Sequence, residues 1–151
     1  MKSLSDATLT TLMLVAGVTL PLQAVINGRL GTQLANPFWA SAIQNVIGAS
    51  LMVFVILAVR SPPPSVGQIA AVPLWAWVGG WLGAIYVLGS LLATPRLGAT
   101  RAMVAVITGQ LAASVVLDHF GILQARRPID LRTVGGLVLL AGGAALILGR
   151  E

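Results

Sequence analysis

The chain has 151 residues, of which 57% are hydrophobic and 9% are charged, and its mean hydropathy is +0.94. A water-soluble domain of this length needs more polar surface, so the composition indicates an integral membrane protein. With no cysteine and one histidine, disulfide frameworks, thiolate metal sites and histidine metal clusters are excluded, and no cofactor is expected. The net charge of +5 does not indicate nucleic acid binding, because the nine Lys and Arg residues are spread along the chain.

Five nearly charge-free stretches approach the roughly 20 apolar residues that cross a bilayer. They predict helices at residues 7–26, 37–59, 69–93, 99–117 and 131–148. The first helix is expected to end at Asn27, Gly28 and Arg29, and the second at Arg60, just before a run of three prolines. No soluble domain is expected outside the helices. Residues 1–151 are therefore predicted to form one transmembrane domain, with function located within or between its helices.

The Lys and Arg residues hardly distinguish the two sides of this topology. Five lie on the side of the N-terminus and four on the opposite side, namely Lys2, Arg60, Arg126, Arg127 and Arg132 against Arg29, Arg96, Arg101 and Arg150. Because cytoplasmic loops accumulate positive charge, this near balance allows insertion in both orientations. Two oppositely inserted copies would form an antiparallel dimer of ten helices, with the inverted symmetry of many transporters. The alternative is a weak bias that still fixes one orientation.

Polar residues recur at helical spacing in the first, second and fourth predicted helices. The three sets are Thr19, Gln23 and Asn27; Ser41, Gln44, Asn45 and Gly48; and Gln110, Ser114 and Asp118. Each set lies on one helix face, and polar groups inside a span face a partner or a watery cavity. Amides bind through hydrogen bonds without carrying charge, so converging sets predict a cavity for a neutral or dipolar substrate. The alternative is that these amides only join helix to helix.

The third predicted helix carries two aromatic residues, Trp81 and Tyr86, that are candidates for the wall of this cavity. Its Gly79 and Gly83 have the Gly-x-x-x-Gly spacing of closely packed helices. The fifth helix has no polar face but repeats small residues, at Gly135, Gly142, Ala145 and Gly149. This repeat is predicted to pack against a second protomer, although packing within the chain explains it nearly as well.

Two charged residues are candidates for contact with a charged substrate. Arg101 lies in the first turn of the fourth helix, where it either contacts an anion or extends to the membrane surface. Asp118 ends the polar face of that helix, where it either binds a cation or proton or pairs with Arg126 or Arg127. No acidic residue lies near the middle of a predicted span. An enzyme is not expected, because neither paired carboxylates nor a catalytic triad is visible.

Some segments of the chain are distinctive when they are taken together and in order. They are residues 21–31 (PLQAVINGRLG), 77–87 (WVGGWLGAIYV) and 95–98 (PRLG), and Gly109-Gln110 followed by residues 118–121 (DHFG). These segments resemble the YdcZ-type family, the five-helix branch of the drug/metabolite transporter superfamily. The resemblance covers nearly the whole chain. It implies a multi-pass protein of the bacterial inner membrane that exports small molecules and is half of a ten-helix fold. The four-helix multidrug exporters of the superfamily use a glutamate in their first helix, which this chain lacks, so cation/proton antiport is not expected.

The sequence therefore predicts an all-α integral membrane protein that exports a small molecule by alternating access. It would act as an antiparallel homodimer, or as a heterodimer with a related chain, enclosing a midplane cavity. The predicted lining is Gln23, Asn27, Gln44, Asn45, Trp81, Tyr86, Gln110 and Ser114. A non-transporting membrane scaffold or regulatory subunit is the main alternative, and a channel is a further one.

Overall fold

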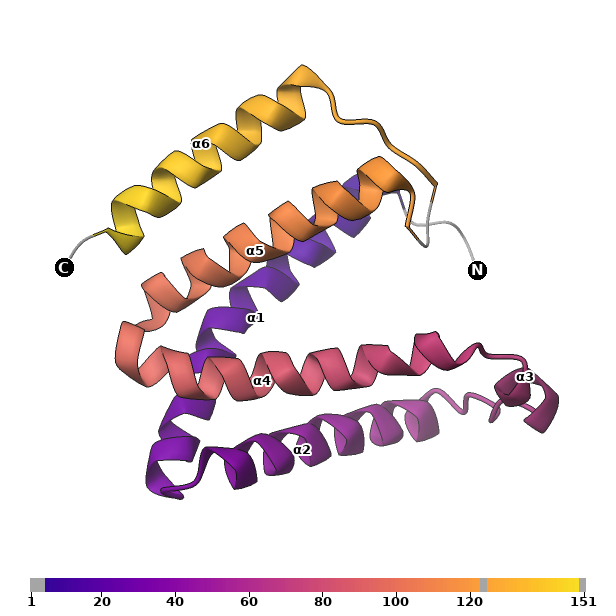
Figure 1. The fold of residues 1–151 in the computed structure, drawn as a ribbon. Helices are drawn as coiled ribbons and strands as arrows, with labels where there is room; N and C mark the ends of the chain where they lie inside the picture. The colour runs from indigo at the N-terminus through magenta and orange to yellow at the C-terminus, as the bar shows by residue number, and fades with distance from the viewer. Residues whose placement is uncertain (1–4, 123–124, 150–151) are drawn as a thin grey trace. The chain divides into compact units, whose positions relative to one another are not determined.

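The computed structural model describes residues 5–122 and 125–149, and within these ranges the regular structure is helical (Figure 1). Lys2 and Arg150, two of the residues counted for orientation, lie outside the described residues. The chain divides into two compact units, Met1–Arg96 and Leu97–Glu151. We call them unit 1 and unit 2 and describe each by itself.

Five helices in the described ranges are long and apolar enough to cross a membrane, which confirms the predicted number. They are α1 (Asp6–Gln33), α2 (Pro37–Ala58), the Leu74–Leu97 span formed by the 3-10 turn η1 (Leu74–Trp77) and α4 (Val78–Leu97), α5 (Ala99–Phe120) and α6 (Leu131–Leu148). A short helix, α3 (Val66–Ala70), precedes the third span.

Helix α1 is longer than predicted. It begins after Ser5, whose Oγ accepts a hydrogen bond from the Thr8 amide at 3.2 Å, and it contains Pro21. The expected end at Asn27, Gly28 and Arg29 is wrong, because the helix continues to Gln33. Packing explains the difference: Gly28 is buried against α4, so tertiary contact outweighs the low helix propensity of glycine.

Helix α2 begins where it was expected, and its N-terminus is well satisfied. The side chain of Asn36 accepts hydrogen bonds from the amides of Phe38 and Trp39, each at 3.1 Å, and Pro37 occupies the first helical position. The third span begins at Leu74 instead of at residue 69, because Pro73 separates it from α3. Helix α3 has its own capping box between Ser65 and Gln68.

Unit 2 contains α5 and α6, which contact each other (Figure 1). Helix α5 extends to Phe120 instead of ending at residue 117, and it stops at Gly121, which adopts a left-handed conformation with φ +65°. Helix α6 begins after Asp130, whose Oδ1 accepts from the amide and the hydroxyl of Thr133 at 2.8 and 2.6 Å. The polar end of α5 is thus helical, and its last turn includes Asp118.

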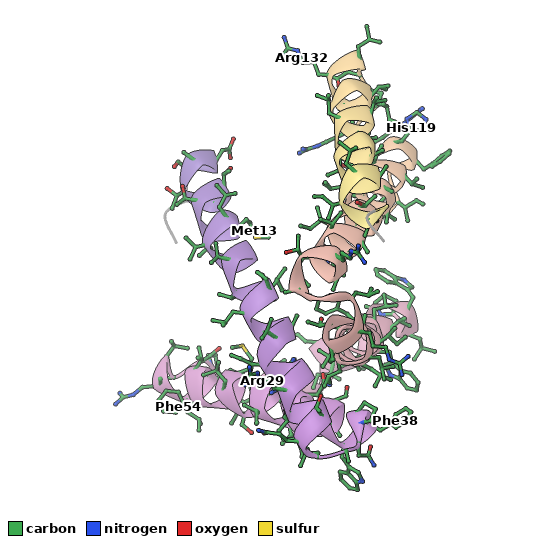
Figure 2. The ribbon with its side chains drawn as sticks, turned by 90° about the vertical axis from the view of Figure 1, so that its left-hand side faces the viewer. Met13, Arg29, Phe38, Phe54, His119 and Arg132 are labelled. Atoms are coloured by element: carbon green, nitrogen blue, oxygen red, sulfur yellow. The ribbon has the colours of Figure 1, made fainter. Side chains whose placement is uncertain are left out.

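Most side chains of the spans project away from the chain. Within the 18-residue apolar stretch of each span, only 6–11% of the residues are buried. Figure 2 shows Met13 on α1 and Phe38 and Phe54 on α2, which are 67–70% exposed. In a membrane protein such surfaces are covered by lipid or by another protein chain.

Candidate functional site

The buried residues of unit 1 gather where α1, α2 and α4 meet. They are Ala24, Asn27, Gly28 and Gly31 on α1, Ala40 and Ser41 on α2, and Ser90, Leu91 and Thr94 on α4. We call this cluster the helix junction. Most of its members are small, which allows helix backbones to approach one another closely.

The glycines of α1 make the closest of these contacts. A Cβ placed on Gly28 would lie 3.1 Å from Cγ of Pro95, and one placed on Gly31 would lie 2.7 Å from Cδ2 of Leu91. The same added atom on Gly31 would lie 3.9 Å from Cβ of Ala40. A larger residue is therefore disfavoured at Gly31, where Leu91 is 3% exposed, and at Gly28 it would require Pro95 to shift by a few tenths of an ångström.

Two polar side chains of the helix junction are buried without a hydrogen-bond partner among the described residues. Asn27 is 1% exposed and Thr94 is 6% exposed, and the atoms concerned are Asn27 Nδ2 and Thr94 Oγ1. Such a group costs about 1–3 kcal/mol when it is buried unpaired. By contrast, the hydroxyl of Ser90 in the same cluster donates to the carbonyl of Val87 at 2.9 Å. The unpaired groups mark the junction as a candidate functional site.

The predicted polar face of α1 divides between two environments. Asn27 is enclosed in the helix junction, whereas Gln23 and Thr19 are exposed. The hydroxyl of Thr19 donates to the carbonyl of Ala16 at 2.7 Å and so is satisfied within its own helix. The buried face of α1 centres on Ala24 and Gly28, and Gln23 lies beside it at helical spacing.

A groove of about 550 Å³ lies between α2 and α4, within unit 1. It is lined by Phe38, Ser41, Ala42 and Asn45 on α2 and by Gly80, Trp81, Ala84, Ile85 and Leu88 on α4. The α2 residues are spaced three and four apart, so they share one helix face. We call this cavity the α2–α4 groove.

The groove unites two of the predicted site residues, Asn45 and Trp81, and its described lining does not include two others, Gln44 and Tyr86. Gln44 and Tyr86 are partly buried elsewhere on the same helices. The amide nitrogen of Asn45 donates to the carbonyl of Ser41 at 2.8 Å.

The residues of these sites that were not predicted from the sequence include Thr94 and Gly31 in the helix junction and Phe38 in the groove. Thr94 and Gly31 each had a signal in the sequence. Thr94 lies four residues after Ser90, and Gly31 lies four residues after Asn27, so both continue a face of small or polar residues.

In unit 2, the predicted polar residues of α5 are not enclosed together. Gln110 and Ser114 are exposed, and the Ser114 hydroxyl donates to the Gln110 carbonyl at 2.8 Å. Arg101 is partly buried near the start of the helix, and Asp118 is partly buried in its last turn. The small pocket at the end of α5 is lined by Asp118, and its described lining does not include the other three residues.

The loop after α5 folds back onto the end of that helix. The amide of Arg127 donates to the carbonyl of Asp118 at 2.8 Å, and Nε of Arg126 donates to the carbonyl of His119 at 2.9 Å. Asp118, Arg127 and Thr133 are among the residues that line a small pocket of about 230 Å³. Basic residues thus satisfy carbonyls at the negative end of the α5 dipole.

The small residues of α6 have open surroundings in the part of the chain that the structure describes. A Cβ added to Gly135 or Gly142 would meet nothing within 4 Å, and Ala145 is exposed. Gly149 differs, since a Cβ there would lie 2.8 Å from the carbonyl oxygen of Ala145.

A family model described as "Putative inner membrane exporter, YdcZ" matches residues 8–146, from the first turn of α1 to the last turn of α6. No curated protein and no solved structure matches the chain. The match and the five spans together show a multi-pass protein of the bacterial inner membrane. The match covers most of the sequence, and the chain belongs to the YdcZ family.

Proposed function

We propose that this protein exports a small molecule across the inner membrane by alternating access, as an antiparallel dimer. The family description supports export. The observation that carries the proposal is Asn27, a fully buried side chain within a membrane span whose amide nitrogen lacks a hydrogen-bond partner among the described residues. A helix that serves only for packing is more stable with an apolar residue there.

Alternating access would provide hydrogen-bond partners for the unpaired groups of Asn27 and Thr94 in one of its states. In such a cycle the helices adopt two arrangements, and groups buried in one arrangement reach the cavity in the other. Asn27 and Thr94 would gain partners when α1 and α4 separate. Helices α1 and α4 approach each other at Gly28 and Gly31, which have no side chains. Few interlocking side chains therefore oppose the separation of the two helices.

The low burial of the spans supports a dimer, because a carrier needs an enclosed cavity and these helices leave most of their residues exposed. The near balance of positive charge supports insertion in both orientations. In the proposed dimer the midplane cavity is lined by side chains from both copies. These are Gln23, Asn27, Gln44, Asn45, Trp81, Tyr86, Gln110 and Ser114.

Helix α6 is the proposed dimer contact, through Gly135, Gly142, Ala145 and Gly149. The open space beside Gly135 and Gly142 supports this assignment, because another helix can approach there. Arg101 and Asp118 are proposed contacts for any charged group on the substrate. A heterodimer with a related chain would use the same surfaces.

Transport by membrane vesicles tests this function. Vesicles with and without the protein are loaded with neutral, cationic and anionic fluorescent dyes, and dye release is followed. We expect faster release of at least one dye, reduced about tenfold by Gln23→Leu or Gln110→Leu. Both residues are exposed, so these changes spare the packing of the chain. Gln33→Leu, at the exposed end of α1, is the matched control and should have no effect.

If no dye is released faster although the protein is inserted, the scaffold alternative is favoured. Equal release by the wild type and both cavity variants would contradict the proposed cavity residues.

A further inference from the structure

The α2–α4 groove has the size and lining of a ligand site. We propose that it binds an uncharged, largely apolar small molecule that carries a hydrogen-bond donor and enters from the bilayer. This inference rests on the proposed export function and specifies the chemical class of its substrate. The volume of about 550 Å³ falls within the roughly 300–1,000 Å³ of small-molecule pockets.

The groove has two distinct ends. Helices α2 and α4 run side by side and antiparallel (Figure 1). Phe38 and Leu88 therefore lie toward one end, and Asn45 and Trp81 toward the other. A ligand that spans the groove thus meets an apolar wall at one end and an amide at the other.

The aromatic residues of the groove are available for contact. Trp81 is 78% exposed and Phe38 is 68% exposed. Flat aromatic side chains provide large apolar contact areas and favour stacking with other rings. An aromatic or alicyclic ligand fits these walls better than a flexible polar one.

Asn45 is the amide of the groove that a polar group of the ligand would meet. Its amide nitrogen already donates to the Ser41 carbonyl at 2.8 Å. This bond uses one of the two N–H groups of the amide, so Asn45 still offers a ligand its carbonyl oxygen, which accepts hydrogen bonds, and a second N–H, which donates one. A ligand N–H or O–H at this end would be bound.

The described lining carries no charged side chain. An ion bound between two membrane spans would lose its hydration without gaining a counter-charge, which is unfavourable. The groove therefore selects neutral molecules. Since both walls are membrane spans, such a molecule reaches it from the hydrocarbon region, where neutral apolar compounds concentrate.

Gly80 provides a way to fill the groove without disturbing the fold. A Cβ added there would meet nothing within 4 Å, and the residue lines the groove. Gly79 also has open space around an added Cβ, but it is not among the described lining residues. Gly80→Leu and Gly79→Leu are therefore a matched pair of variants.

Energy transfer from Trp81 to a bound probe tests the site. The full-length protein in lipid nanodiscs carries Trp39→Phe, Trp75→Phe and Trp77→Phe, so that Trp81 is its one remaining tryptophan. The probe is N-phenyl-1-naphthylamine, which is neutral, aromatic and has one N–H. Binding to the groove gives a saturable signal, whereas partition into lipid rises linearly with probe concentration.

We expect a saturable signal with N-phenyl-1-naphthylamine. The affinity for a naphthyl-trimethylammonium probe should be at least tenfold lower, because that probe is charged. The affinity for the N-methylated neutral probe should be several-fold lower, because that probe has no N–H. Gly80→Leu should weaken binding at least tenfold, and Gly79→Leu should leave it unchanged. A linear signal alone means that lipid or a second copy occupies the groove, and this overturns the proposal. Equal binding of the cationic probe, or binding that survives Gly80→Leu, overturns it as well.

Dye release from vesicles separates this inference from the export function. If the probe binds as expected but no dye is exported, the function fails and the site stands. If export of neutral dyes continues in Gly80→Leu, the site fails and the function stands.

Discussion

Gly31 on α1 lies so close to Leu91 on α4 that a Cβ at position 31 would come within 2.7 Å of Leu91 Cδ2. Leu91 is 3% exposed and so has little room to move away. This contact fixes the approach of α1 to α4. The same approach encloses Asn27, four residues earlier on α1.

Enlarging Gly31 should destabilise unit 1. We expect Gly31→Leu to lower the free energy of unfolding by about 1–3 kcal/mol, because the larger side chain overpacks the junction. Unfolding followed by circular dichroism in detergent micelles measures this change. Gly17→Leu is the control, since an added Cβ at Gly17 meets nothing within 4 Å on the same helix. Equal stability of the two variants would show that the α1–α4 contact is absent in the protein.

Removing the unpaired hydroxyl of Thr94 should stabilise the protein. Thr94→Val keeps the shape of the side chain and eliminates a buried group without a partner among the described residues, a gain of about 1–3 kcal/mol. Thr108→Val is the control, because the Thr108 hydroxyl already donates to the Val104 carbonyl at 2.7 Å. The same unfolding measurement should show a gain for the first variant and none for the second. A loss of stability in Thr94→Val would mean that its hydroxyl is paired.

Ala35 is a strained residue between α1 and α2. Its φ is +48°, in the left-handed region that costs a residue with a Cβ about 1–2 kcal/mol. Ala35→Gly should therefore raise the free energy of unfolding by about 1 kcal/mol, by relief of this strain. Gly121→Ala should have the opposite effect, because φ is +65° there and the new Cβ would lie 3.0 Å from Cβ of Arg126. Thermal unfolding of both variants checks the two signs, and a loss in Ala35→Gly would contradict the first.

Thr133 lowers the pKa of the Asp130 carboxyl below its ordinary value of 3.8, by hydrogen bonds from its side chain and its amide. The pKa of Asp130 is therefore lower in the folded protein than in the unfolded chain. At pH values above the unfolded pKa, the ionised carboxylate contributes fully to stability. This contribution is lost as the pH falls through the folded pKa. Thr133→Val should raise the pKa of Asp130, and Thr133→Ser should not. Carbon NMR of the carboxyl group measures both. An unchanged pKa in Thr133→Val would contradict the hydrogen bond from the Thr133 hydroxyl to Asp130.

Hydropathy predicts the five spans because each is a long apolar run, yet it does not predict where they end. Helix α1 continues to Gln33 because Gly28 and Gly31 are held against other helices, a tertiary effect that local propensity does not contain. The break between α3 and the third span is marked in the sequence by Pro73. The apolar residues on both sides of Pro73 made the two helices resemble one continuous span. Element type was therefore predictable, and packing-dependent boundaries were not.

The site was predicted in part for the same reason. Helical spacing identifies Asn27, Asn45 and Trp81 as residues of interest, but it does not determine which neighbour each one meets. Burial of Asn27 depends on the helices that pack against α1, and the presence of Asn45 and Trp81 in one groove depends on how α2 and α4 align. Thr94 was overlooked because its burial without a hydrogen-bond partner among the described residues is a property of the packed helices and not of the sequence pattern.

Orientation in the membrane tests the central claim, export by an antiparallel dimer, most directly. A reporter that is active only in the cytoplasm and one that is active only in the periplasm are fused in turn to the C-terminus, and both activities are quantified in cells. We predict comparable signal from the two fusions, since copies inserted both ways are needed for an antiparallel homodimer. Signal from one fusion alone would contradict the homodimer and show that the chain has one fixed orientation.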